Sequence, residues 1–349
     1  MYKNPLANDL DHVLALTEPL WKEIRGERLF ITGGTGFVGC WLLETFAWAN
    51  SRLGLKSCAL VLTRNPNAFI GKAPHLANYP AIEFLSGDVR TFSPPTGQLP
   101  FIIHGAAESS TKLNTEQPLM MLEVIVRGTM RVLDFAERAG TKKLLYLSSG
   151  AVYGRQPATM THIPEDYPGG PDTTDIKSAY AEGKRTGELL CALASKRSHL
   201  QTKIARLFAF VGPYLPLDVH FAVGNFIRDG IAGGPIRVKG DGTPYRSYLY
   251  AADLAVWLWT ILFRGESCVP YNVGSEQALS VGDLAGRVAA CFPQPVKVHV
   301  VGKPEPGVPA ERYVPSVQRA FSSLGLSQTV ELEQAVCNTI AWHGTEIRT

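Results

Sequence analysis

Clusters of basic residues are scarce in this chain of 349 residues, in which Lys and Arg exceed Asp and Glu by only 34 − 31 = 3. No run of Lys and Arg is longer than two, as at Lys142-Lys143 and Lys196-Arg197. Nucleic acids and anionic membrane surfaces are bound by concentrated positive charge, which this pattern does not supply. We therefore expect neither nucleic acid nor a membrane as a partner.

Cysteine pairs and long apolar runs are also missing. The six cysteines form no C-x-x-C pair and several lie in apolar runs, so the sequence predicts buried free thiols in a reducing compartment rather than disulfides or a zinc site. The longest apolar stretch, residues 254–263, is about half of the roughly 20 residues that a bilayer crossing needs. Asn8, Asp9 and Asp11 stand where a signal peptide would need an apolar core. These features predict a cytoplasmic protein.

Apolar runs of strand length alternate with segments of helical spacing over the first two hundred residues. The expected strands are 28–32, 58–63, 82–85, 101–104, 143–147 and 203–208, and the expected helices are 11–25, 40–52, 120–139 and 180–194. This alternation is typical of an α/β fold with a Rossmann-type, doubly wound parallel sheet. A hydrophobic content of 45% is enough to form the core of such a domain.

The pattern loosens after residue 211, where Gly and Pro become frequent and only short helices, 221–230 and 251–263, are expected. We predict a helical extension over 1–26, a Rossmann domain over 27–211 and a smaller substrate-binding lobe over 212–349. Within that lobe, 246–263 is expected to return to the Rossmann domain. Ligands of open α/β sheets bind at the carboxyl ends of the strands, so the lobe is expected to cover that rim.

A glycine loop lies directly between the first expected strand and the first long helix after it. In Gly33-x-x-Gly36-x-x-Gly39 the first glycine allows a tight turn, the second lets the backbone approach a pyrophosphate, and the third lets helix and strand pack closely. The helix N-terminus adds free N–H groups and partial positive charge. A merely structural turn is the alternative to dinucleotide binding. The cofactor-binding residues predicted here are Gly33, Thr35, Gly36, Phe37, Val38 and Gly39.

The ends of the next two strands indicate which dinucleotide is bound. NAD sites usually place an acid after the second strand, but here Arg64 follows it and could pair with a 2′-phosphate. This favours NADP(H), with NAD(H) possible, and a surface arginine is the alternative. Asp88, in Gly87-Asp88-Val89, is placed to accept a hydrogen bond from the adenine amino group, unless it is a solvated turn residue.

Tyr180 and Lys184 are four residues apart at the start of a helix and therefore share one face. A tyrosine needs its pKa lowered by about three units, roughly 4 kcal/mol, to act as an acid or base near pH 7. The lysine ammonium and the positive helix end act in that direction. Ser149 ends the fifth strand and could donate a hydrogen bond to a developing alkoxide. Together with the glycine loop, this set predicts Ser149, Tyr180 and Lys184 as catalytic.

The ordered set of motifs resembles the extended short-chain dehydrogenases/reductases of the nucleotide-sugar epimerase/dehydratase type, over about residues 28–340. The matching segments are 32–39, 87–89, 104–107, 147–154, 180–184, 212–213, 240–243 with Arg246, Asp253 and 271–274. The resemblance implies an NAD(P)-dependent enzyme with a nucleotide-sugar substrate and a homodimer formed through two long helices.

The resemblance also assigns roles to individual positions. It implies that Tyr180 moves the proton, that Lys184 holds the nicotinamide ribose and that Ser149 binds the reacting sugar oxygen. It adds Val89 and Ala106 to the cofactor site. For the substrate it implies diphosphate contacts from Arg246 and Asn225, a hydroxyl contact from Glu108 and a place beside Gly150.

Two positions after the catalytic serine bear on the reaction. Dehydratases of the family carry an acid pair there, and sugar-acid decarboxylases resemble a pattern with glutamate in the second place, but this chain has Gly150 and Ala151. The sequence therefore favours reduction of a nucleotide-linked 4-keto(-6-deoxy) hexose by NADPH. A 4-epimerase with tightly bound NAD is the alternative, and a non-catalytic, cofactor-sensing homologue is the second alternative.

The chain also departs from the family at two positions where an asparagine is usual. Ile125 stands in the place of one and Ala209 in the place of the other, which normally touches the substrate. The way in which the substrate is held is therefore not fixed by the resemblance.

Overall fold

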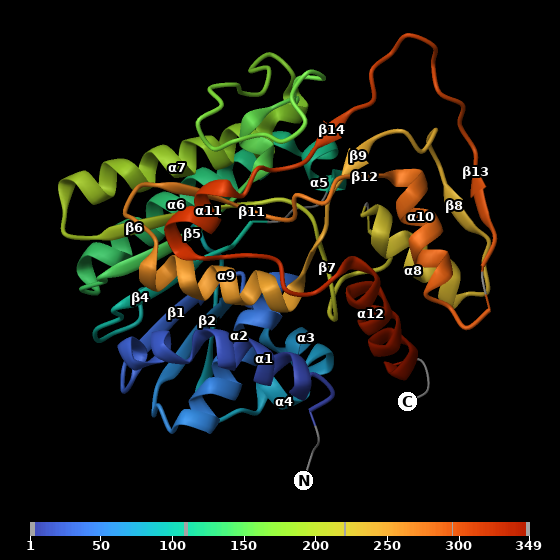
Figure 1. Ribbon diagram of the computed structural model, residues 1–349. Helices are drawn as coiled ribbons and strands as arrows, with labels where there is room; N and C mark the ends of the chain where they lie inside the picture. Colours follow the sequence, from blue (N-terminus) through green and yellow to red (C-terminus); the bar gives the residue numbers. More distant parts are fainter. Residues whose placement is uncertain (1–3, 108–110, 220, 295, 347–349) are drawn as a thin grey trace. The chain divides into compact units, whose positions relative to one another are not determined.

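The computed structural model describes residues 4–107, 111–219, 221–294 and 296–346, and it divides the chain into two compact units (Figure 1). The first unit contains Met1–Val152, Pro171–Leu207 and Ala255–Tyr271. The second contains Tyr153–Gly170, Phe208–Leu254 and Asn272–Thr349. The segment that returns to the first unit is thus 255–271, where the sequence suggested 246–263.

A seven-stranded sheet in the order β11-β6-β5-β4-β1-β2-β3 organises the first unit. Its strands are β1 Arg28–Thr32, β2 Cys58–Thr63, β3 Ile82–Ser86, β4 Phe101–His104, β5 Lys143–Ser149, β6 Gln201–Leu207 and β11 Pro270–Val273. The pairings among β1 to β6 are parallel, and the chain changes direction across the sheet where β4 pairs with β1. This is the doubly wound topology that the sequence predicted.

The strands are apolar on both faces because helices cover both. Leu29, Phe30 and Ile31 in β1 are fully buried. One face is covered by α2 (Phe37–Leu53) and α9 (Ala251–Arg264), whose Trp259 Nε1 donates a hydrogen bond of 2.8 Å to Thr45 Oγ1 of α2. The N-terminal elements α1 (Ala7–Thr17) and η1 (Glu18–Ile24) pack on this side, since the Trp21 and Trp259 rings lie 4.7 Å apart.

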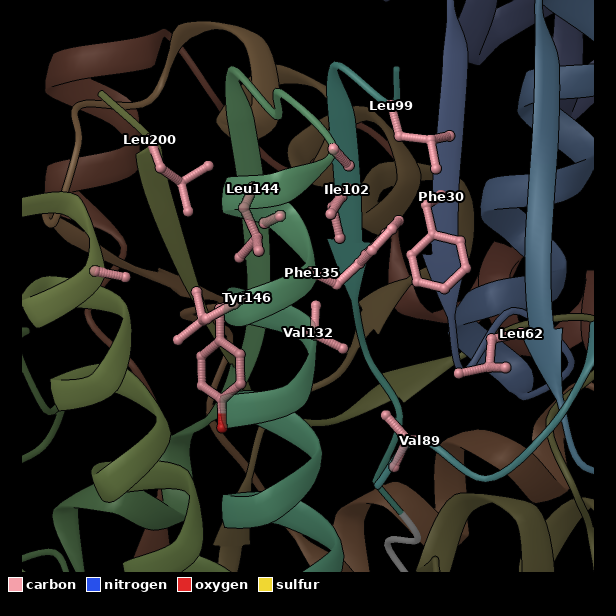
Figure 2. Close-up of a cluster of buried hydrophobic side chains, with 14 of the residues drawn as sticks. Phe30, Leu62, Val89, Leu99, Ile102, Val132, Phe135, Leu144, Tyr146 and Leu200 are labelled. Carbon is pink, nitrogen blue, oxygen red and sulfur yellow. The ribbon is translucent and has the colours of Figure 1, made fainter. Parts of the chain in front are cut away.

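The other face is covered by α6 (Pro118–Arg138) and α7 (Ala179–Arg197). Figure 2 shows the apolar cluster beneath them, in which Phe135 of α6 packs edge-on against Phe30 at 5.2 Å between ring centres. The packing of α7 depends on a glycine: a Cβ at Gly187 would lie 2.0 Å from the Tyr146 hydroxyl of β5. Helix α7 therefore lies against the sheet at a distance that only glycine permits.

The remaining elements of the first unit are short. They are α3 Pro66–Lys72, α4 Pro74–Ala77, α5 Thr111–Glu116 and η3 Ile176–Ser178, with η2 Gly150–Tyr153 starting at the end of β5. Helix α3 is capped by the Asn65 side chain, which accepts a hydrogen bond from Ala68 N. The helix begins soon after β2 ends, at the carboxyl edge of the sheet, where the glycine loop also lies.

The second unit contains three small sheets, β10-β7, β12-β9-β14 and β13-β8. Its elements are β7 Phe210–Val211, α8 Ala222–Ile231, β8 Ile236–Val238, β9 Tyr245–Arg246, β10 Leu249–Tyr250, β12 Leu279–Ser280, α10 Val281–Ala290, β13 Val298–Val300, β14 Arg312–Tyr313, α11 Gln318–Leu324 and α12 Leu332–Glu346. Asn272 joins its segments from a buried position: its Oδ1 accepts from the Tyr153 hydroxyl at 2.7 Å, and its Nδ2 donates to the carbonyls of Ile163 and Ser316.

The six expected strands and the expected helices are confirmed to within a few residues, except that the N-terminal helix begins at Ala7 and continues as the 3-10 helix η1. The strand β11, the short elements of the first unit and most elements of the second unit were not expected. All six cysteines are free, as expected, but only Cys40 and Cys191 are fully buried. Among the residues that the structure describes, no helix has the length and apolarity of a membrane span.

Candidate active site

The glycine loop has the backbone that its spacing predicted. Gly33 has φ of +77°, and a Cβ there would lie 2.6 Å from the carbonyl oxygen of Gly105 in the loop after β4. A Cβ at Gly39 would lie 2.4 Å from the carbonyl oxygen of Gly33. Gly36 is the N-cap residue of α2 and is exposed, with Phe37 and Val38 half-buried after it. The loop thus brings the positive end of α2 to the carboxyl edge of the sheet.

Behind this loop, a buried histidine links β1, β4 and α6. The Thr32 hydroxyl accepts a hydrogen bond from Ala106 N at 3.1 Å and lies 2.7 Å from His104 Nδ1. His104 Nε2 lies 3.1 Å from Thr129 Oγ1, which gives its own proton to the carbonyl of Ile125 and can therefore only accept from Nε2. In the neutral ring the proton is thus on Nε2, and Nδ1 accepts from the Thr32 hydroxyl. These hydrogen bonds also hold Ala106, a predicted cofactor residue, beside the glycine loop.

Burial lowers the pKa of His104 from 6.5 to about 3, and the charge of Lys184 acts in the same direction. The neutral ring is therefore the stable form in the folded protein throughout the physiological range. His104 opens the matching segment 104–107, but its role could not be predicted from the sequence, because its partners are distant in the chain.

Arg64 is exposed directly after β2, as the sequence predicted. Asp88 lies near enough for the Arg64 charge to contribute to lowering its pKa, but the largest contribution comes from hydrogen bonds with Arg90. Arg90 donates from Nε to Asp88 Oδ1 and from Nη2 to Asp88 Oδ2, both at 2.9 Å. The carboxylate is therefore oriented by a bidentate partner that the sequence analysis missed. The adenine contact of Asp88 stays a prediction.

Two further contacts define this end of the site. Val89 is buried against α6, where a Cβ at Gly128 would lie 2.8 Å from it. Lys72, the last residue of α3, donates from Nζ to the carbonyl of Thr35 at 3.1 Å. A second cation therefore stands at the glycine loop, and no sequence motif pointed to it.

The three predicted catalytic residues meet at the end of β5. Ser149 is the last residue of this strand, and its Oγ accepts from Ala151 N at 3.1 Å. Tyr180 lies in the first turn of α7, with its side chain close enough to Ser149 for the serine to lower the pKa of the phenol. Lys184 is buried one turn further, where its Nζ donates to the Leu147 carbonyl at 2.7 Å. All three side chains belong to the first unit.

The expected lowering of the Tyr180 pKa is wrong. Burial raises the pKa of Tyr180, and the nearby Ser149 side chain opposes this only in part. The Lys184 ammonium is 5.9 Å from the Tyr180 ring centre and is itself poorly solvated, since burial lowers its pKa to about 8. The cost of removing the phenolate from water therefore exceeds the attraction of the cation. The phenol is protonated in the resting site.

The predicted substrate residues are distributed over both units. Gly150 begins η2 directly after Ser149, whereas Glu108 lies outside the described residues. Asn225 is half-buried in α8, and Arg246 lies in β9, where its Nη1 donates to the carbonyl of Tyr245 at 2.8 Å. Asn225 and Arg246 belong to the second unit, so their contacts with a diphosphate stay predictions.

The sequence and the fold can now be compared with known proteins. Residues 29–274 match the model of the NAD dependent epimerase/dehydratase family. The chain belongs to this family. It is thus an NAD-dependent enzyme of the short-chain dehydrogenase/reductase superfamily, which confirms the resemblance drawn from its motifs.

Relatives and solved structures agree on the fold and differ in activity. UDP-glucuronic acid decarboxylase 2 of Arabidopsis thaliana is 28% identical over 321 residues, which are 91% of this chain and 68% of the relative. An epimerase from Methanothermobacter thermautotrophicus superposes with a TM-score of 0.77 at 21% identity, covering 96% of this chain and 97% of the other. A UDP-glucose 4-epimerase from Thermotoga maritima, with UDP-glucose, has a TM-score of 0.75 at 17% identity, covering 92% and 99%.

We predict that His104 makes the protein acid-labile through the unfolded state. Its pKa is 6.5 when unfolded and about 3 when folded, so protons bind the unfolded chain first and stability falls as pH drops below 6.5. Between pH 7.5 and pH 5.5 this group costs about 1.4 kcal/mol. Urea unfolding of wild type and His104→Gln at both pH values measures the difference. Equal losses in the two proteins would contradict the assignment.

Proposed function

We propose that the protein is an NAD(P)-dependent oxidoreductase that reduces a nucleotide-linked 4-keto(-6-deoxy) hexose, with Tyr180 as proton donor. The observation that carries this is the protonated phenol of Tyr180, beside Ser149 at the end of β5, with no acid at Gly150 or Ala151. A phenol that holds its proton at neutral pH has one to give to a developing alkoxide, whereas taking a proton from a hydroxyl would require the phenolate.

The residues divide the chemistry in a simple way. When bound, the nicotinamide cofactor supplies the hydride. Ser149 donates a hydrogen bond to the sugar oxygen and orients the carbonyl, and Tyr180 delivers its proton to that oxygen as negative charge develops on it. Lys184 would hold the nicotinamide ribose with its ammonium. The glycine loop residues Gly33 to Gly39 would hold the pyrophosphate at the N-terminus of α2.

Dehydration and decarboxylation are less well supported by the side chains present. A hydrogen at Gly150 and a methyl group at Ala151 cannot move a proton. Several relatives are named decarboxylases, but this chain has alanine at position 151, where the resemblance implies a glutamate for that reaction. The 4-epimerase stays the second candidate, because the family is NAD-dependent and epimerisation needs no acid pair. The intact Ser149, Tyr180 and Lys184 set argues against a purely cofactor-sensing protein.

The product of the reaction distinguishes these candidates. The protein is incubated with NADPH or NADH and a panel of nucleotide-linked 4-keto sugars, hexoses and uronic acids, and the products are weighed by mass spectrometry. We expect a gain of two mass units with a 4-keto sugar. An isomer of the hexose would select epimerisation, and loss of carbon dioxide from the uronic acid would contradict the assignment based on Ala151.

Replacing Tyr180 by Phe removes only the hydroxyl that we assign to proton transfer. We expect kcat to fall at least about a hundredfold, because general acid catalysis contributes about 10²–10⁴. The NADH dissociation constant, followed by fluorescence, is expected to stay within a few-fold of wild type. Unchanged turnover would remove Tyr180 from the mechanism, while loss of NADH binding would show that the substitution disturbs the fold instead.

We propose that NADP(H) is the preferred cofactor, because Arg64 is exposed where NAD sites usually carry an acid. The guanidinium could pair with a 2′-phosphate, and the Lys72 ammonium at Thr35 adds positive charge to the same loop. Arg64→Ala is expected to weaken NADPH binding by about 2 kcal/mol and NADH binding hardly at all. Arg138→Ala, at the exposed end of α6, is the control. Equal losses for the two cofactors would contradict the proposal.

We also propose a homodimer formed through α6 and α7, as the resemblance implies. Both helices expose large apolar residues at helical spacing: Leu119 and Met130 on α6 are 70% and 50% exposed, and Leu189 and Leu193 on α7 are 60% and 56% exposed. Such a surface is typical of protein interfaces. Leu189→Glu with Leu193→Glu is expected to give monomers in light scattering, whereas Leu16→Glu on α1 is not. A wild-type monomer would refute the dimer.

A further inference from the structure

A carboxylate lies behind the catalytic residues, one turn beyond Lys184 on α7. Glu188 accepts a hydrogen bond from Ser148 Oγ at 2.5 Å. Arg206 of β6 binds the same carboxylate from two nitrogens, Nε to Oε1 at 3.0 Å and Nη2 to Oε2 at 2.7 Å. The side chains of Glu188 and Arg206 are only 12% and 14% exposed. A buried, bidentate pair of this kind fixes both geometry and charge.

Three secondary-structure elements therefore meet at one carboxylate. Ser148 precedes Ser149 in β5, Arg206 belongs to the neighbouring strand β6, and Glu188 belongs to the helix that carries Tyr180 and Lys184. The hydrogen bonds of Glu188 tie α7 to both strands at the height of the catalytic groups. A shift of α7 along the sheet would break these contacts.

The carboxylate also acts on a cation that the protein has removed from water. The Lys184 ammonium is buried, and burial favours its neutral form. Glu188 is the largest influence in the opposite direction, followed by the Cys191 thiol on the same helix. From the sheet, the neutral His104 of β4 and the ring of Tyr146, 5.1 Å away, face the ammonium and supply no formal negative charge. The charge on Lys184 is thus supported by Glu188.

We propose that Glu188, held by Ser148 and Arg206, is a positioning residue that keeps Lys184 charged and fixes the catalytic end of α7 on the sheet. The inference rests on the proposed role of Lys184 in holding the cofactor. It does not depend on whether the sugar is reduced or epimerised. Arg206 has two effects: it holds the Glu188 carboxylate in place, and its positive charge partly offsets the effect of that carboxylate on Lys184. Removing Glu188 and removing Arg206 must then act on Lys184 in opposite directions.

The test follows NADH affinity by fluorescence from pH 6 to pH 9.5. A charged ammonium binds the ribose more strongly than a neutral amine, so wild-type affinity is expected to fall as pH rises through the Lys184 pKa, about 8. Glu188→Gln is expected to move this fall to lower pH by about half a unit or more, and Arg206→Gln to move it to higher pH. Glu137→Gln, which removes an exposed carboxylate on α6, is the control and leaves the midpoint unchanged.

Three results would overturn the proposal. The first is an NADH affinity that Glu188→Gln weakens equally at every pH, as a merely structural role would. The others are midpoint shifts of the same sign in both variants, and a wild-type affinity that does not change between pH 6 and pH 9.5. If Glu188→Gln does not fold, the shift of Arg206→Gln to higher pH still tests the proposal. Arg206→Lys, which keeps both charges, is then its matched control and is expected to keep its midpoint near wild type. Cofactor binding with this pH dependence, but no turnover of any sugar, would refute the proposed function and leave this inference standing.

Discussion

The burial of the Lys184 ammonium is the constraint on which the rest of the candidate site depends. A cation in a poorly solvated place needs a carbonyl to receive its hydrogen bond and a carboxylate to support its charge. Leu147 supplies the first at 2.7 Å, and Glu188 supplies the second one turn along α7. His104 and Tyr180 are buried beside this ammonium, and their own burial keeps the imidazole neutral and the phenol protonated, with the Lys184 charge adding to the effect on His104. Removal from water thus sets the protonation of all three groups.

Much of the first unit could be predicted because its signals are local. A glycine loop between an apolar run and a helical segment identifies β1 and α2 without any knowledge of distant contacts. The strand–helix alternation gives the doubly wound sheet in the same way. The strand β11 was missed because its four residues, Pro270–Val273, carry no periodicity of their own and pair only with a strand far earlier in the chain.

The supporting residues of the site could not be predicted for a related reason. His104 and Thr32 are 72 residues apart, and Arg206 and Glu188 are 18 residues apart on different elements. Only the folded sheet brings these pairs together. The Tyr180 pKa was misjudged because spacing shows that a lysine is near but cannot show how completely both groups leave water. The sequence motifs therefore indicated which groups react, whereas the burial and protonation of these groups could be seen only in the structure.

The tight approach of α7 to β5 has a consequence for how this helix can vary. The Tyr146 hydroxyl fills the space into which any side chain at position 187 would grow, since a Cβ would lie 2.0 Å away. Position 183 is less restricted, because a Cβ there would meet the Ile125 side chain at 3.2 Å. Along this helix, residue 187 is therefore the position that tolerates no enlargement.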